Sequence, residues 1–190
     1  MFGLLFRSVR QPFCFELSKT MSSQACSKPP IDQALTPISW LIGKWKGEGC
    51  GIYPTISPFT YLEEVTFDHF GKPILTYNAK SFSTTDQTPM HYESGYMRIK
   101  PGTSTLAFII AQNAGISEVE EGEVKDKEIH LLSHTIGRMT FGADPKVTKV
   151  ERIYRLTTDQ DTMEYIMHME TDRTPQAQHL HITYKRVKDN

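Results

Sequence analysis

The chain has 190 residues, a length that fits one globular domain with a terminal extension. Its 21 basic and 22 acidic residues nearly balance, which excludes the basic excess of a general nucleic-acid-binding protein. Three cysteines without a CxxC pair exclude a disulfide scaffold and a structural zinc site of the usual spacing. No apolar run approaches the ~20 residues of a membrane-spanning helix.

Residues 1–34 are predicted to form a disordered basic leader, and residues 35–190 the folded domain. The first thirty residues are rich in serine and contain four basic side chains but a single acid, Glu16. This composition weakly resembles a mitochondrial presequence, although Pro12 interrupts its apolar stretch. Because the apolar stretch is broken and helical periodicity is poor, a disordered leader is favoured over a presequence. We expect a cytoplasmic location, with the nucleus as a second compartment, or mitochondria if residues 1–30 act as a presequence.

From residue 38 onward, short β-rich runs alternate with turn signals, after one helical turn expected at 38–42. Strands are predicted at 43–53, 59–70, 74–84, 90–99, 104–113, 116–124, 128–135, 147–157, 163–170 and 179–187, with a shorter one near 137–142. Sequential hairpins remove their exposed edges most simply by closure. The sequence thus predicts an all-β fold, a ten-stranded antiparallel up-and-down barrel like those of fatty-acid-binding proteins and lipocalins.

Some predicted strands have acidic residues on the same face as apolar ones. Glu63 shares the phase of Tyr61 and Val65, and Glu93 lies in phase with His91. Because a barrel of this size can hold a ligand, such residues are candidates for the wall of an internal cavity. Simple alternation, with these side chains facing water, explains the pattern equally well.

The segment Gly43–Gly49 reads GxWxGxG at the start of the first predicted strand. Glycines at alternate positions leave one face of the strand open to close backbone approach. Trp45 shares their phase and is predicted to close one end of the barrel. Since the first and last strands meet in a closed barrel, Lys185 or Arg186 is expected over its ring.

The chain has seven histidines, and two of them, His179 and His181, form an HxH pair in the last predicted strand. The pair is not a metal site by itself, because the spacing fixes no third ligand. One imidazole suffices to ligate a haem iron. The preceding strand carries a soft, polarisable row in one phase: Met163, Tyr165, Met167 and Met169. Such a row suits a flat macrocycle or an ordinary core.

His179 lies in the phase opposite to the apolar residues of its strand, Leu180, Ile182 and Tyr184. Strict alternation would turn its side chain away from a cavity that they line. A position at the rim, or a β-bulge just after Thr174-Pro175, would resolve the conflict.

The ordered motifs together resemble the nitrobindin family, a group of small haem-binding β-barrels. The resemblance covers nearly all of residues 35–190 and rests on PISWL (37–41), GxWxGxG (43–49), YPT (53–55), YLEEV (61–65), PMH (89–91), AQN (111–113), EVEEG (118–122) and QHLH (178–181). It is especially close to the animal form, which in some proteins follows a THAP zinc finger. The leader lacks the C2CH set of cysteines and histidine of that finger, so DNA binding is not expected.

This resemblance implies a barrel that binds haem b through its iron, with His179 as the axial ligand. It places four further residues beside the haem: Thr55, Met90, His91 and Met169. It also implies that the protein binds nitric oxide and, with ferric iron, isomerises peroxynitrite to nitrate. The expected partners are therefore haem and these two small molecules, and neither nucleic acid nor a membrane.

Two other functions fit the same residues. A non-enzymatic carrier of an apolar ligand, such as a fatty acid, needs an internal carboxylate clamp, for which Arg186 and Tyr184 are candidates. A haem-based nitric oxide sensor or carrier would use the same pocket and show isomerase chemistry only incidentally.

Overall fold

Runs of alternating apolar and polar residues form ten strands after one short helix in the computed structural model, which describes residues 27–188. The 3₁₀ helix η1 spans Gln33–Leu41. The strands are β1 (Gly43–Tyr53), β2 (Ile56–His69), β3 (Ile74–Ser83), β4 (Pro89–Ile99), β5 (Thr105–Gln112), β6 (Ile116–Lys125), β7 (Glu128–Arg138), β8 (Val147–Leu156), β9 (Thr162–Thr171) and β10 (Thr174–Val187). Most of the predicted leader lies outside the described residues.

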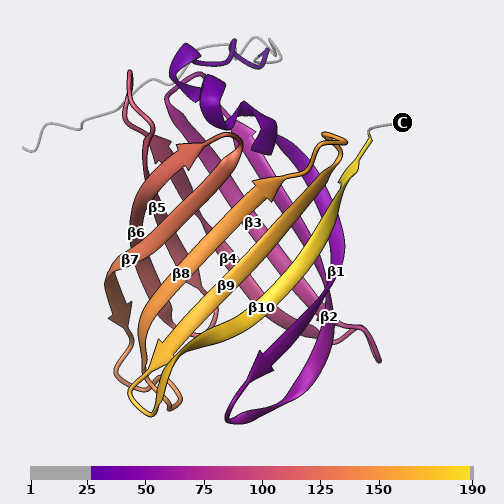
Figure 1. Cartoon of the computed structure of the whole chain (residues 1–190), viewed down its shortest axis with the longest axis vertical. Coiled ribbons are helices and arrows are strands. Elements are labelled where there is room, and N and C mark those ends of the chain that lie inside the picture. Colours follow the sequence, from indigo (N-terminus) through magenta and orange to yellow (C-terminus); the bar gives the residue numbers. More distant parts are fainter. Residues whose placement is uncertain (1–26, 189–190) are drawn as a thin grey trace, which may run out of the picture.

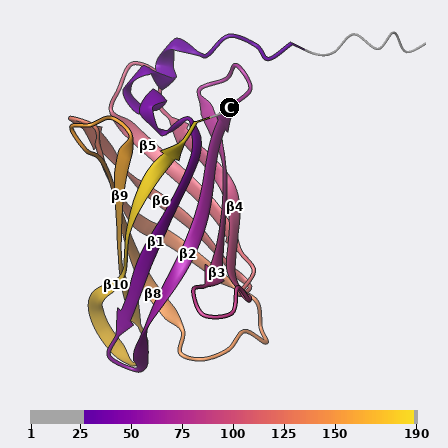
Figure 2. The same cartoon turned by 90° about the vertical axis from the view of Figure 1, so that its right-hand side faces the viewer.

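The sheet closes on itself, because each strand pairs with its neighbours in sequence and β1 also pairs with β10 (Figure 1, Figure 2). All pairs are antiparallel, so the predicted ten-stranded up-and-down barrel is confirmed. Among the described residues, no helix has the length and apolar character needed to cross a membrane.

The short extra strand predicted near 137–142 is wrong. Strand β7 continues to Arg138, and the following residues turn toward β8. The side chain of Arg138 holds this turn by donating hydrogen bonds to the carbonyl oxygens of Gly142 and Ala143. A loop closed in this way presents no extended backbone for pairing.

The glycines of β1 allow the close approach that their spacing predicts. A Cβ atom at Gly47 would lie 2.3 Å from the carbonyl oxygen of Thr183 on β10. At Gly49 it would lie 2.7 Å from Cζ of the Tyr61 ring. Both contacts are too short for any side chain, so glycine lets β1 bend between its two neighbours.

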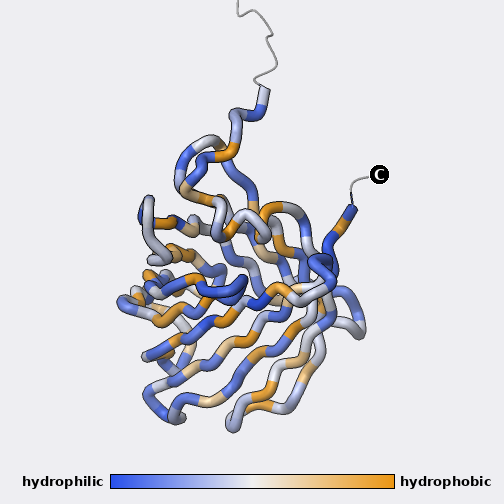
Figure 3. The backbone as a smooth tube through the Cα atoms, turned by 45° about the horizontal axis from the view of Figure 1, so that its top comes forward, coloured by the Kyte–Doolittle hydropathy of each residue, from blue (hydrophilic) through white to orange (hydrophobic). Residues whose placement is uncertain are grey.

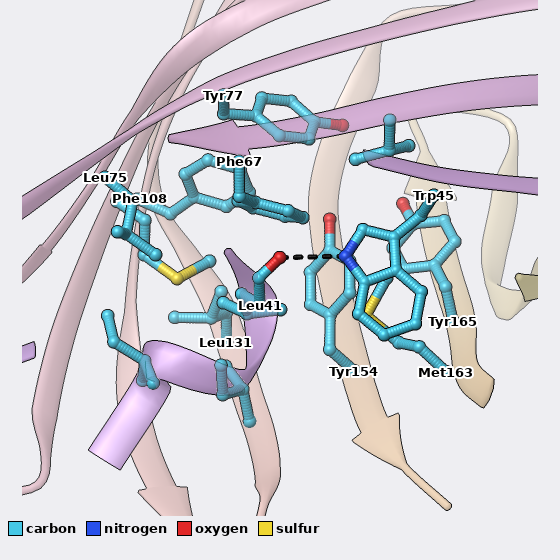
Figure 4. Close-up of a cluster of buried hydrophobic side chains, with 14 of the residues drawn as sticks. Leu41, Trp45, Phe67, Leu75, Tyr77, Phe108, Leu131, Tyr154, Met163 and Tyr165 are labelled. Atoms are coloured by element: carbon cyan, nitrogen blue, oxygen red, sulfur yellow. Dashed lines mark hydrogen bonds between the residues drawn. The ribbon is translucent and has the colours of Figure 1, made fainter. Parts of the chain in front are cut away.

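The helix η1 lies over one end of the barrel (Figure 1), and Trp45 packs there beside Leu41 (Figure 4), as predicted for Trp45. The indole is fully buried, and its Nε1 donates a hydrogen bond to the carbonyl oxygen of Leu41 at 2.8 Å. Cζ of Arg186 lies 4.1 Å from the ring centroid, which confirms the expected cation–π contact. Lys185 instead reaches Asp159, at 3.4 Å.

Aromatic side chains fill the half of the barrel next to Trp45. The ring of Phe67 lies 5.3 Å from Tyr77 and 6.1 Å from Tyr154, and Tyr77 lies 4.9 Å from Phe108, as centroid distances. Hydrophobic and hydrophilic residues alternate along the strands around this core (Figure 3). The solid half confines any internal cavity to the other end.

Trp45→Ala should lower the free energy of unfolding by about 3–5 kcal/mol, because it removes a large, fully buried ring and leaves a void. Urea denaturation followed by circular dichroism measures this loss. Tyr96→Ala is the control, since Tyr96 is 53% exposed on the outer face. Equal stability of the two variants would show that Trp45 does not close the barrel.

Candidate functional site

The end of the barrel opposite η1 contains a cavity of about 350 Å³, a size typical of small-molecule sites. The β1–β2 and β9–β10 hairpins lie at this end (Figure 1). Apolar side chains from five strands line part of its wall: Phe59, Met90, Ile116, Val147, Met167 and Met169. Polar side chains line the rest, among them Tyr61, Glu63, His91, Glu93, Gln112 and Arg152. Glu93 and Arg152 are buried, so the cavity combines apolar walls with a buried polar floor, whereas the side chain of His91 is 39% exposed.

A β-bulge turns His179 toward this cavity. Gln178 pairs with His168 and Leu180 pairs with Met167, so His179 is an extra residue in β10 with no partner on β9. The extra residue shifts the alternation, and both His179 and Leu180 line the cavity. A β-bulge was one of the two arrangements predicted for His179, because its phase is opposite to that of the apolar residues of the strand.

The surroundings of His179 suit a neutral imidazole that binds a metal. Its Nδ1 lies 3.4 Å from the carbonyl oxygen of Ile52, which can only accept, so Nδ1 carries the proton. The rings of Tyr53 and Phe59 meet it edge-on, with centroids 5.3 and 6.4 Å away. Burial lowers the pKa of His179 below its ordinary value. Nε2 is therefore left with a free lone pair.

The structure brings most of the predicted site residues together, although not all of them. Met90, His91 and Met169 line the same cavity as His179. Thr55 lies exposed in the turn between β1 and β2 and does not line the cavity. His181 pairs with Cys50 and also lies outside it. In residues 27–188, no three His, Cys, Asp or Glu side chains are arranged to hold a metal ion among themselves.

The methionine row predicted on β9 divides between two environments. Met167 and Met169 line the cavity, together with Tyr165. Met163 is fully buried in the core beside Trp45 (Figure 4). The row is thus core packing at Met163 and cavity lining at Met167 and Met169.

A buried ionic cluster under the cavity was missed in the sequence. Arg152 is 1% exposed and donates to three carboxylates. Its Nε lies 2.7 Å from Glu120, its Nη2 2.8 Å from Glu118, and its Nη1 3.2 Å from Glu93. The motif EVEEG (118–122) could have indicated this cluster. Alternation places Glu118 and Glu120 on the same face of the strand, and two buried acids require a basic partner.

The carboxyl groups of the cluster have pKa values shifted in opposite directions. Burial would raise the pKa of Glu93, but the attraction of Arg152 outweighs it and lowers that pKa to about 2. Burial raises the pKa of Glu120 against the attraction of Arg152, and the nearby Glu118 raises it further. Burial also raises the pKa of Glu63 to about 7, against the hydrogen bond donated by Tyr184.

Glu63 makes stability fall as pH rises toward neutrality. The pKa of this carboxyl is 4.5 when unfolded and about 7 when folded, so between these values only the folded state keeps the proton. The free energy of unfolding should decline through this window, and Glu63→Gln should remove part of the decline. Urea denaturation at several pH values measures it. Glu64→Gln, on the exposed side of β2, should keep the wild-type profile, and an unchanged profile for Glu63→Gln would contradict the assignment.

The two candidates for a fatty-acid clamp are engaged elsewhere. Arg186 lies at the Trp45 end and donates to the carbonyl oxygens of Ile42 and Trp40 at 2.8 and 2.9 Å. The hydroxyl of Tyr184 donates to Glu63. Neither side chain offers a free donor to a carboxylate in the cavity.

A closed barrel with an internal cavity lined by apolar side chains and two imidazoles, His91 and His179, defines a ligand-binding β-barrel. Residues 34–186 match the family described as "THAP4-like, heme-binding beta-barrel domain". The chain therefore belongs to this family, in agreement with the resemblance of its motifs to nitrobindins.

Known relatives extend this comparison. The human protein named "Peroxynitrite isomerase THAP4" is 41% identical over 88% of this chain, which spans 29% of that protein's length. The Arabidopsis thaliana protein named "Peroxynitrite isomerase Rv2717c" is 37% identical, over 80% of this chain and 88% of its own length. The crystal structure of Rv2717c from M. tuberculosis superposes with a TM-score of 0.75 and 36% identity, over 84% of this chain and all of that one.

Proposed function

We propose that this chain binds haem b in the cavity through His179 and isomerises peroxynitrite to nitrate. The observation that carries the proposal is the imidazole of His179, whose Nδ1 contacts the carbonyl oxygen of Ile52 while Nε2 stays free at the cavity. The names of the human and Arabidopsis relatives support the activity. Nitric oxide is proposed as a second small ligand of the same pocket.

The chain's own residues hold the cofactor and shape its surroundings. The carbonyl of Ile52 fixes the orientation and the tautomer of His179, as partners of ligating histidines usually do. Met90, Met167 and Met169 provide polarisable walls for a flat ring system. When bound, ferric haem would supply a Lewis-acidic iron for the isomerisation of peroxynitrite to nitrate. The apolar side chains of the cavity wall would limit the access of water to a bound substrate.

The charge of the cavity floor disfavours the fatty-acid carrier. Arg152 is the arginine among the cavity-lining residues, and the side chains of Glu93, Glu118 and Glu120 already pair with it. A fatty-acid head group placed there would meet a net negative site and no free donor of Arg152.

Stopped-flow mixing of peroxynitrite with the haem-loaded chain tests the activity. We expect faster decay than with the haem-free chain, and a higher yield of nitrate relative to nitrite. A chain that binds haem but leaves both quantities unchanged would be a sensor or carrier of nitric oxide. A chain that binds no haem but takes up a fluorescent fatty acid would favour the carrier.

A further inference from the structure

Two polar side chains on the cavity wall are held from behind by the Arg152 cluster, which we define as Arg152, Glu93, Glu118 and Glu120. Nε2 of His91 lies 3.1 Å from Oε1 of Glu93. Nε2 of Gln112 donates to Oε1 of Glu118 at 2.9 Å. The same Nη2 atom of Arg152 donates to both carboxylates, at 3.3 Å to Glu93 and 2.8 Å to Glu118.

The donors around Glu93 fix its role in these contacts. Its Oε2 accepts from the hydroxyl of Tyr77 at 2.9 Å and from Nη1 of Arg152 at 3.2 Å. An ionised carboxylate in such a setting can only accept, so the contact requires a proton on Nε2 of His91. Nδ1 is then the ring nitrogen that remains for a group in the cavity.

The same reasoning orients Gln112. Its amide nitrogen is tied to Glu118, and that carboxylate is itself held by Arg152. The side-chain carbonyl of Gln112 is therefore directed away from Glu118. An isolated glutamine in a cavity wall could turn its amide either way, whereas this one has a single favoured orientation.

We propose that the Arg152 cluster is a positioning device that presents His91 and Gln112 to a ligand in the cavity. His91 is held as the Nε2–H tautomer, and Gln112 is held by its amide nitrogen. Each side chain thus offers one defined hydrogen-bonding atom, Nδ1 and Oε1. The use of these atoms by peroxynitrite or nitric oxide rests on the proposed function, whereas the tautomer and the amide orientation do not depend on haem.

Stability alone does not account for this cluster. Burying one guanidinium with three carboxylates carries a large desolvation cost, and well-packed apolar residues are often at least as stabilising. Oε2 of Glu120 is buried without a hydrogen-bond partner among the described residues, which adds to that cost. The cluster contacts His91 and Gln112, and its orientation of these two side chains gives a reason for an arrangement with this cost.

The tautomer is tested by ¹⁵N–¹H NMR of the histidine rings in the full chain, both porphyrin-free and loaded with zinc protoporphyrin. We expect His91 to show only the Nε2–H tautomer. Glu93→Gln should lose this single state, because an amide can donate as well as accept. Glu151→Gln is the matched control, since Glu151 contacts His130 and His168 rather than His91. Mixed tautomers in the wild type, or no change in Glu93→Gln, would overturn the proposal.

The effect on a bound ligand is read from the infrared C–O stretch of the carbon monoxide complex of the reduced, haem-loaded chain. One narrow band is expected for the wild type, and a broadened or shifted band for Glu93→Gln and Glu118→Gln. A band that neither variant alters would overturn the positioning role, even with haem bound and isomerase activity intact. Failure to bind haem would instead contradict the proposed function, and the NMR result for the porphyrin-free chain would still decide the tautomer.

Discussion

His179→Ala is expected to abolish the histidine-ligated haem spectrum and most peroxynitrite isomerisation, while the barrel stays folded. The position of the iron depends on its axial nitrogen, and the cavity offers His179 with Nε2 free. The side chain is partly exposed at the cavity entrance, so its removal creates no large void in the core. Absorption spectroscopy and peroxynitrite decay measure the loss, and circular dichroism checks the fold.

Two other histidines serve as controls for this assignment. His181→Ala should retain the spectrum and the activity, because His181 lies outside the cavity. His91 also lines the cavity and has Nδ1 free while Nε2 contacts Glu93, so it is the competing nitrogen donor; if His179 is the axial ligand, His91→Ala should keep the ligated spectrum. Added imidazole should partly restore the spectrum of His179→Ala. A variant at position 91 or 181 that loses ligation while His179→Ala keeps it would contradict the assignment.

Arg152→Met should lower the free energy of unfolding by about 3–5 kcal/mol, since it leaves buried carboxylates without their counter-charge. The carboxylates of Glu93 and Glu118 are 7% and 1% exposed, so water cannot replace the lost guanidinium. Combining Arg152→Met with Glu93→Gln and Glu118→Gln should recover part of this loss, because the remaining groups are then neutral. Urea denaturation of the variants measures both effects.

Arg155→Met is the matched control for this prediction. Arg155 lies on the same strand and also pairs with two acids, Glu128 and Glu164, but its side chain is 46% exposed. Exposed ion pairs contribute at most about 1 kcal/mol. Equal losses from the two arginine variants would mean that burial does not set the importance of Arg152.

The fold could be predicted from the sequence because its determinants are local. Alternation and turn residues define each strand, and the hairpin between β6 and β7 turns at Asp126 and Lys127, both with positive φ, as a type I′ turn requires. The strand expected near 137–142 failed because Arg138 fastens that segment as a loop through its side chain. A contact between a side chain and a loop carbonyl oxygen does not change the alternation of apolar and polar residues, so the sequence pattern cannot reveal it.

The site could be predicted only in part, because it depends on contacts between distant strands. Alternation placed Glu63 and Glu93 on an apolar face but could not tell a cavity wall from solvent. Arg152 sits between Val150 and Tyr154, and its burial follows only from acids 32 to 59 positions away. The bulge at His179 was one of two predicted outcomes, and the pairing of β10 with β9 decides between them.

Titration of the full-length chain with ferric haem, followed by visible absorption, tests the central claim most directly. If the cavity and His179 form a haem site, the spectrum should develop the Soret band of a five-coordinate, histidine-ligated iron and saturate at one haem per chain. After reduction, resonance Raman should show an iron–histidine stretch. A titration that yields only the spectrum of free haem, without saturation, would contradict the assignment of this barrel as a haem protein.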